Sequence, residues 1–167
     1  MERFLDNFNT KQIDPDILPC LQFVTDISAL KSVLRQSHMV KQDRKENSAE
    51  HSWHLIMMAI SLQHIANETI DLPKVIKMLA VHDLGEINPG DTFLYAETRN
   101  DNSSERECVS EITENLSPSL REEILALWDE FDARQTNNAK FAQAIDRFQP
   151  FLYMLENKGE AWKRHGI

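Results

Sequence analysis

Apolar residues recur at intervals of three and four along most of this chain, and that spacing constrains its fold more than any other feature. Residues 17–37 show it well, with apolar side chains that include Ile17, Leu18, Leu21, Val24, Ile27, Leu30 and Leu34. Such spacing gathers apolar side chains on one face of a helix. No segment of the sequence alternates convincingly between apolar and polar residues, as a half-buried strand would. We therefore predict an all-α fold, built as a single helical bundle.

Start and stop signals divide the chain into a series of helices. We expect helices over 17–37, 48–67, 73–84, 103–115, 118–132 and 137–156, with a short helix over 158–167. Pro73 and Pro118 stand in the first turns of their helices, Ser48 is a suitable N-cap, and Gly85 closes the third helix. Residues 38–47 are expected to form a polar connection.

Composition and charge exclude several classes of protein. The 167 residues are 41% hydrophobic and 27% charged, as in an ordinary globular domain, and we expect one domain over 1–167. The net charge of −9 disfavours binding to polymeric nucleic acid. No apolar run reaches ~18 residues, and the N-terminus is too polar for a signal peptide. Cys20 and Cys108 lack metal-ligand spacing, so we expect a cytoplasmic protein with reduced thiols and no membrane contact.

One segment carries a local excess of positive charge despite the acidic total. Between residues 31 and 45, one acid, Asp43, is accompanied by five bases: Lys31, Arg35, Lys41, Arg44 and Lys45. Such a patch can steer a small anionic substrate. For most of the five, a solvated surface charge is the simpler interpretation.

Two types of metal ligand stand side by side at His82 and Asp83. His82 shares the apolar side of its predicted helix with Val75 and Leu79, so its imidazole should point inward. Asp83 follows at the last turn, where the chain is about to leave the helix and both side chains can turn toward one ion. A carboxylate at a helix C-terminus is unfavourable with the helix dipole unless a cation compensates it. A divalent cation would provide that compensation, but the doublet alone is a weak signal and needs further ligands.

His51 and Asp146 are the candidates to complete such a site. His51 shares an apolar stripe with Leu55, whereas His54 lies on a polar face of the same helix. Asp146 borders the apolar face of the helix over 137–156. Taken singly, a hydrogen-bonded core histidine and a salt bridge are the competing explanations. The combined set is His51, His82, Asp83 and Asp146. Such mixed nitrogen and oxygen ligation suits Mn, Fe, Co, Ni or Zn.

Three segments carry these residues in the order His, His-Asp, Asp: SAEHSWHLIMMA, LAVHDLGEINPGD and AIDRFQPFLYMLENKGEAWKRHGI. Over roughly 25–167 the chain resembles the HD-domain superfamily of metal-dependent phosphohydrolases, and specifically its 5′-deoxynucleotidase-like branch. The resemblance implies a compact helical fold with core motifs over about 25–157, one divalent metal ion and a homodimer. It also implies hydrolysis of a phosphate monoester of a small nucleotide.

Carried over by position, the resemblance assigns further roles. It makes His51, His82, Asp83 and Asp146 the metal ligands. Glu86 and Asp91 match two acids that follow the doublet, and either would exchange a proton with the attacking water or the leaving oxygen. Arg35 matches an arginine that contacts the substrate phosphate. The aromatic neighbour found in nucleotidase members is replaced here, because residues 36–38 read Gln-Ser-His. The sugar preference therefore stays open.

Three alternatives also stay open. An HD hydrolase can act on cyclic dinucleotides, alarmones, triphosphates or pyrophosphate, although the short loops favour a small monophosphate. A non-catalytic HD protein can keep its metal as a regulatory device, and the presence of Glu86 and Asp91 counts against this. A helical interaction module would use the histidines as core residues and bind no metal.

Overall fold

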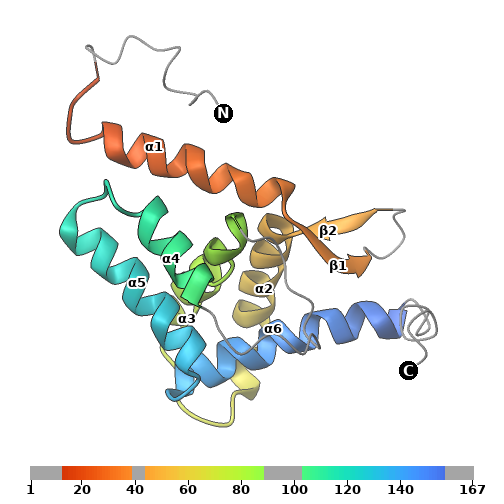
Figure 1. The fold of residues 1–167 in the computed structure, drawn as a ribbon. Coiled ribbons are helices and arrows are strands. Elements are labelled where there is room, and N and C mark those ends of the chain that lie inside the picture. The colour runs from red at the N-terminus through yellow and green to blue at the C-terminus, as the bar shows by residue number, and fades with distance from the viewer. Residues whose placement is uncertain (1–12, 39–43, 89–102, 157–167) are drawn as a thin grey trace.

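The computed structural model describes residues 13–38, 44–88 and 103–156 (Figure 1). Its elements are α1 (Leu18–Asp26), the 3-10 helix η3 (Ile27–Ser32), β1 (Leu34–His38), β2 (Lys45–Asn47), α2 (Ser48–Leu62), the 3-10 helix η4 (Gln63–Ile65), α3 (Leu72–Val81), the 3-10 helix η5 (Leu84–Ile87), α4 (Ser103–Ile112), α5 (Pro118–Ala133) and α6 (Asn137–Glu156). Helices dominate these described residues, and the predicted all-α class is confirmed. The predicted helix over 158–167 lies outside them.

Helix α3 lies at the centre of the larger core, with contacts to α2, α5 and α6. Its apolar residues Val75, Met78 and Leu79 follow helical spacing, and all three are fully buried. They pack with Leu55 on α2 and with residues of α5 and α6. Burial of each such side chain stabilises the fold by roughly 1.5–3 kcal/mol. This core holds α2, α3 and α6 together, and these three helices carry the predicted metal ligands.

A second core cluster connects the turn after α3 to the outer helices. Its buried members are Leu30, Leu84, Val109, Leu116, Ile124 and Trp128. The indole N–H of Trp128 donates a hydrogen bond of 3.1 Å to the backbone carbonyl of His82. Helix α5 therefore fixes the backbone at the start of the His-Asp doublet.

The prediction of one helix over 17–37 is wrong. Helix α1 ends at Asp26, η3 follows, and Val33 is already extended, with φ −79° and ψ 109°. Residues 34–38 then form β1, which pairs antiparallel with β2 inside the segment expected to be a connection. Two strands of five and three residues are too short to show an alternating pattern, and their pairing decides the structure. Arg35 therefore lies on a strand.

Helix boundaries differ from the sequence prediction in two places that affect the site. Asn47, rather than Ser48, caps α2: its side chain accepts the Glu50 N–H at 3.0 Å, and the Glu50 carboxylate accepts the Asn47 N–H at 3.2 Å. This reciprocal capping box leaves Ser48 inside the first turn. Helix α3 ends at Val81, before the doublet, instead of at residue 84.

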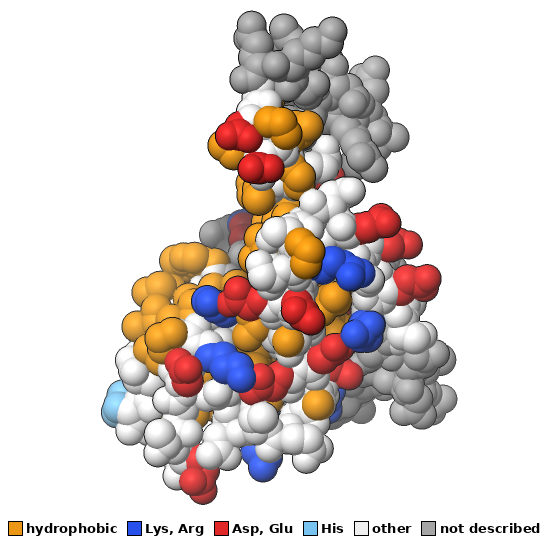
Figure 2. Space-filling model, turned by 90° about the vertical axis from the view of Figure 1, so that its left-hand side faces the viewer, with side chains coloured by type: hydrophobic (Ala, Val, Ile, Leu, Met, Phe, Trp, Pro, Cys, Tyr) orange, Lys and Arg blue, Asp and Glu red, His pale blue; other side chains and the backbone are white. Residues whose placement is uncertain are grey.

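Helix α1 presents an apolar face to solvent. Ile17, Leu21 and Val24 follow helical spacing and are exposed, and Figure 2 shows hydrophobic side chains gathered on this part of the molecule. Within the described ranges, the helices are too short or too polar to cross a bilayer.

Candidate metal centre

The structure brings the four predicted metal ligands together from three helices. His51 lies in the first turn of α2, and His82 and Asp83 follow the end of α3; one ligand atom of each lies within 4.8 Å of the others. Asp146 reaches the cluster from α6, with its Oδ1 atom 3.0 Å from Nε2 of His51 and 4.0 Å from Nε2 of His82. All four side chains are buried or nearly so. The site thus contains two imidazoles and two carboxylates.

The end of α3 explains how adjacent residues converge on one place. Asp83 has left the helix, with φ −91° and ψ 2°, and its Oδ1 atom lies 3.0 Å from Nε2 of His82. In mid-helix the two side chains would diverge by about 100°. The His82 ring is fixed by a 2.8 Å hydrogen bond from Nδ1 to the carbonyl of Leu79 and packs against Phe131 of α5.

Gly85 lets this turn lie directly on α4. A Cβ atom at Gly85 would come within 2.7 Å of the Cβ atom and 2.9 Å of the carbonyl oxygen of Glu105. Both are rigidly placed atoms of a helix, so a side chain does not fit. Gly85 does not close α3, as the sequence predicted, because it lies four residues beyond Val81; close backbone packing is what requires it.

One ring nitrogen gives a direct test of whether these residues fit a metal ion. His82 uses Nδ1 to donate to Leu79, which leaves its Nε2 atom as the lone-pair side of the neutral ring. Among the described residues, this buried Nε2 atom has no well-formed hydrogen bond. It faces the carboxylates of Asp83 and Asp146. An acceptor nitrogen and two carboxylates around one position match the ligand preferences of a divalent transition metal.

Electrostatics in the cluster also favour a bound cation. Burial by itself would lower the pKa of His82, but the carboxylates of Asp83 and Asp146 outweigh it and raise the pKa to about 9. The negative surroundings that favour a proton at Nε2 would equally favour a metal ion in its place. Burial would raise the pKa of Asp83, yet His82 and Arg35 hold it well below its usual range. The pKa of Asp146 is lowered as well, against burial, by its hydrogen bond to His51. Both carboxylates are therefore ionised at neutral pH.

Arg35 lies at the edge of the centre instead of on the open surface. Its Nη1 atom donates to Oδ2 of Asp83 at 2.9 Å and lies 3.7 Å from Oε2 of Glu86. The side chain is 15% exposed. Glu86 also accepts a 2.8 Å hydrogen bond from the hydroxyl of Ser48. Two of the predicted functional residues thus adjoin the ligand cluster, while Asp91 lies outside the described residues.

Sequence reasoning missed Glu46, a 1% exposed carboxylate whose Oε2 atom lies 3.5 Å from Nδ1 of His51. Burial would raise the pKa of Glu46, but His51, Gln149 and Tyr153 together lower it. A lone glutamate in a polar segment looks like a surface residue. Its position follows from the pairing of β1 with β2, for which the sequence offers no signal.

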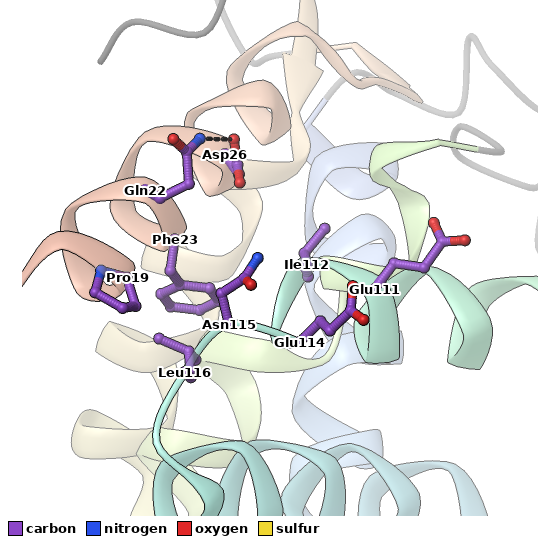
Figure 3. A pocket seen from close by; sticks show the side chains of 9 residues that line it. All are labelled: Pro19, Gln22, Phe23, Asp26, Glu111, Ile112, Glu114, Asn115 and Leu116. Carbon is purple, nitrogen blue, oxygen red and sulfur yellow. Dashed lines mark hydrogen bonds between the residues drawn. The ribbon is translucent and has the colours of Figure 1, made fainter. Parts of the chain in front are cut away.

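A separate hollow of about 270 Å³ lies between α1 and the last turn of α4 with the chain just after it (Figure 3). Phe23 and Leu116 contribute apolar surface, and three acids line it: Asp26, Glu111 and Glu114. No basic residue is part of this lining. The hollow shares no residue with the metal centre, and its charge is wrong for a phosphate ligand.

The family model described as HD domain matches residues 27–167. This match covers most of the chain, so the protein belongs to the HD domain family. The resemblance found in the sequence is thereby confirmed.

Several relatives carry enzyme names. The zebrafish (Danio rerio) protein 5′-deoxynucleotidase HDDC2 is 29% identical over 81% of this chain and 68% of its own length. The human protein of the same name is 27% identical over 81% of this chain and 67% of its own length. The Schizosaccharomyces pombe protein 5′-deoxynucleotidase hdd1 is 28% identical over 83% of this chain and 72% of its own length.

Solved structures share the fold. A predicted metal-dependent phosphohydrolase from Magnetospirillum magnetotacticum MS-1 is 40% identical, with a TM-score of 0.85 over 91% of this chain and 77% of that chain. A conserved hypothetical protein from Pyrococcus furiosus has a TM-score of 0.60 at 23% identity, over 81% of this chain and 84% of that chain. The second likeness concerns the fold alone.

Proposed function

We propose that this protein is a divalent-metal-dependent phosphohydrolase that releases phosphate from nucleoside or deoxynucleoside 5′-monophosphates. The observation that supports it most is the convergence of two imidazoles and two carboxylates from α2, α3 and α6, with an arginine beside them. The names of the relatives support the same reaction class, since they are 5′-deoxynucleotidases and a metal-dependent phosphohydrolase.

The residues that would hold the ion are His51, His82, Asp83 and Asp146. Mixed nitrogen and oxygen ligation favours Mn, Co, Fe, Ni or Zn as the ion. When bound, such an ion supplies Lewis-acid polarisation of the phosphoryl group and lowers the pKa of water. The four side chains belong to elements packed around one core, so their relative positions are set before the ion or the substrate binds.

Arg35 is proposed to bind the substrate phosphate. The guanidinium is always charged, lies 2.9 Å from Asp83, and presents a planar fork of N–H groups whose geometry matches the oxygens of a phosphate. Its charge lies against Asp83, so the phosphate would be held next to the metal ligands. In this position Arg35 would lie close to the negative charge that builds up on the phosphoryl group during its transfer.

Glu86 and Asp91 are proposed to handle the proton that moves during hydrolysis. Glu86 is half-buried, accepts from Ser48 and lies beside Arg35, so its carboxylate is held near the proposed phosphate position. A carboxylate so placed can take a proton from the attacking water or return one to the leaving oxygen. Asp91, which the sequence comparison with the family suggests, is the second candidate for this proton transfer.

The proposal is tested by phosphate release from a panel of ribo- and deoxyribonucleoside 5′-monophosphates. Metal-stripped protein would receive Mn, Co, Ni, Zn or Mg in turn. We expect release with a transition metal, lost in Asp83→Asn and kept in Asp129→Asn, which alters an exposed acid that pairs with Arg106 on the surface. A protein that binds an ion but releases phosphate from none of these substrates would contradict the proposed activity.

A further inference from the structure

A buried carboxylate lies behind His51, on the side away from the proposed ligands. Nε2 of His51 lies 3.0 Å from Asp146, while its Nδ1 atom lies 3.5 Å from Oε2 of Glu46. The imidazole is thus placed between two carboxylates, with its ring fully buried. Glu46 has no part in the proposed reaction.

Glu46 is held in place by donors from α6, the helix that also carries Asp146. The side-chain amide of Gln149 donates to both carboxylate oxygens, at 2.8 and 3.0 Å, and the hydroxyl of Tyr153 donates to Oε1 at 3.0 Å. Gln149 is itself fully buried. Burying a carboxylate is unfavourable unless its oxygens are bonded in this way. The three hydrogen bonds from Gln149 and Tyr153 therefore indicate that Glu46 is ionised in its buried position.

We propose that Glu46 is a positioning residue for the metal centre: it accepts the N–H of His51 at Nδ1, so that the Nε2 lone pair faces the ion. This inference rests on the proposed metal centre. A neutral imidazole carries one ring proton, and a carboxylate faces each nitrogen of His51. An ion held by Nε2 and Asp146 would take the lone pair of Nε2, so the proton would stay at Nδ1, where Glu46 can accept it. Histidine ligands in metal sites are commonly oriented by a carboxylate in this manner.

Glu46→Gln separates this role from simple packing. Gln149 and Tyr153 are donors to the present carboxylate, so the amide oxygen of the new side chain should face them. Its NH₂ group then points at Nδ1 of His51, which must become an acceptor. The ring proton moves to Nε2, where it blocks metal ligation.

A matched control exists in Tyr153→Phe. It removes one hydrogen bond from Glu46 but leaves the carboxylate beside His51. If Glu46 merely filled space, both substitutions would affect the metal centre alike. A positioning role predicts that metal affinity falls about 10–100-fold in Glu46→Gln. In Tyr153→Phe the affinity should stay within about three-fold, because the acceptor at Nδ1 remains.

The test is a Zn²⁺ and Co²⁺ titration of the metal-stripped full chain against a competing chromogenic chelator, with thermal melts of each variant to establish folding. The expected loss in Glu46→Gln, absent from Tyr153→Phe, supports the role; equal affinities of Glu46→Gln and the wild type overturn it. Should Glu46→Gln fail to fold, Glu46→Asp replaces it, because its carboxylate is withdrawn from His51 and affinity should fall at least about three-fold.

The titration needs no substrate, so it is separate from the proposed activity. Metal binding by the wild type without phosphate release would contradict the activity and leave the Glu46 comparison intact. No metal binding by the wild type would overturn both. Where the wild type is active, Glu46→Gln at saturating metal should keep the substrate KM within about two-fold, because Arg35 holds the phosphate.

Discussion

The helices α2, α3 and α6 and the small sheet of β1 and β2 both reach the candidate metal centre, but they contribute different kinds of residue. The helices, together with the turn directly after α3, supply the four proposed ligands, which lie beside one apolar core. The strands supply Arg35 and Glu46, which lie next to ligands and alter their charge and orientation. Ligand positions therefore depend on helix packing, whereas the surrounding charges depend on a short strand pairing.

Removing a proposed metal ligand should have the largest effect. In His82→Ala we expect loss of bound metal and a fall in kcat/KM on the order of 10³-fold, because several kcal/mol of charge stabilisation disappear. Metal analysis and phosphate release measure the two effects. His64→Ala, an exposed histidine of η4, is the control and should change neither. Full metal content and turnover in His82→Ala would show that the ligand assignment is wrong.

Removing the strand arginine should have an intermediate effect of a different kind. In Arg35→Ala we expect metal to stay bound while kcat/KM falls roughly 10–100-fold, the value of a charge-assisted hydrogen bond of about 1.5–3 kcal/mol. Steady-state kinetics at saturating metal measure it. Lys31→Ala removes an exposed charge from the same basic segment and should have little effect. Loss of metal from Arg35→Ala would show that Arg35 helps to hold the ion and does not act on the substrate phosphate alone.

A substitution at Gly85 tests how far the ligand turn depends on α4. The added methyl group of Gly85→Ala collides with Glu105, and the free energy of unfolding should fall by about 1–3 kcal/mol. Urea unfolding measures this change. Metal affinity should fall as well, since the doublet must shift. An unchanged unfolding midpoint would mean that the turn packs less closely than described.

The junction between β2 and α2 offers a smaller test. Asn47→Ala removes the side-chain acceptor of the capping box and should lower the free energy of unfolding by about 1 kcal/mol. Asn47→Asp keeps an acceptor and should retain most of the stability. Chemical unfolding of both variants gives the comparison. Equal losses in the two would show that the cap contributes little.

The smallest expected effect lies in an ion pair remote from the centre. Lys74 and Thr136 lower the pKa of Glu130, against burial, so this acid stabilises the fold above pH 4.5 and loses that contribution as the pH falls. Glu130→Gln should therefore reduce the free energy of unfolding by up to about 1 kcal/mol near neutral pH. The difference from the wild type should shrink as the pH falls below about 4.5. A constant difference across this range would exclude the ion pair as its cause.

The parts of the site that follow helical periodicity could be predicted from the sequence. Apolar stripes indicate which way His51 and His82 point, and the doublet at a helix end indicates a shared ligand position. The surroundings of these ligands could not be predicted, because they depend on contacts between segments distant in sequence. Glu46 reaches His51 through a strand pairing and is held by residues about a hundred positions away.

Boundaries were harder to predict than helices for a related reason. Ser48 and Asn47 are both good caps by residue type, and the choice falls on Asn47 because Glu50 completes its capping box. The hydroxyl of Ser48 instead donates to Glu86, a residue 38 positions away. Only the tertiary structure shows that Asn47 is the N-cap and that Ser48 bonds to Glu86.

The central claim is that the histidine and aspartate cluster holds the ion that hydrolysis requires. The most direct test titrates metal-stripped protein with Mn²⁺ or Co²⁺ and follows bound metal and phosphate release from a deoxynucleoside 5′-monophosphate in the same samples. The account predicts that activity rises in proportion to bound metal and saturates at one ion per chain, with neither seen in Asp83→Asn. Activity that is independent of bound metal, or that survives in Asp83→Asn, would contradict it.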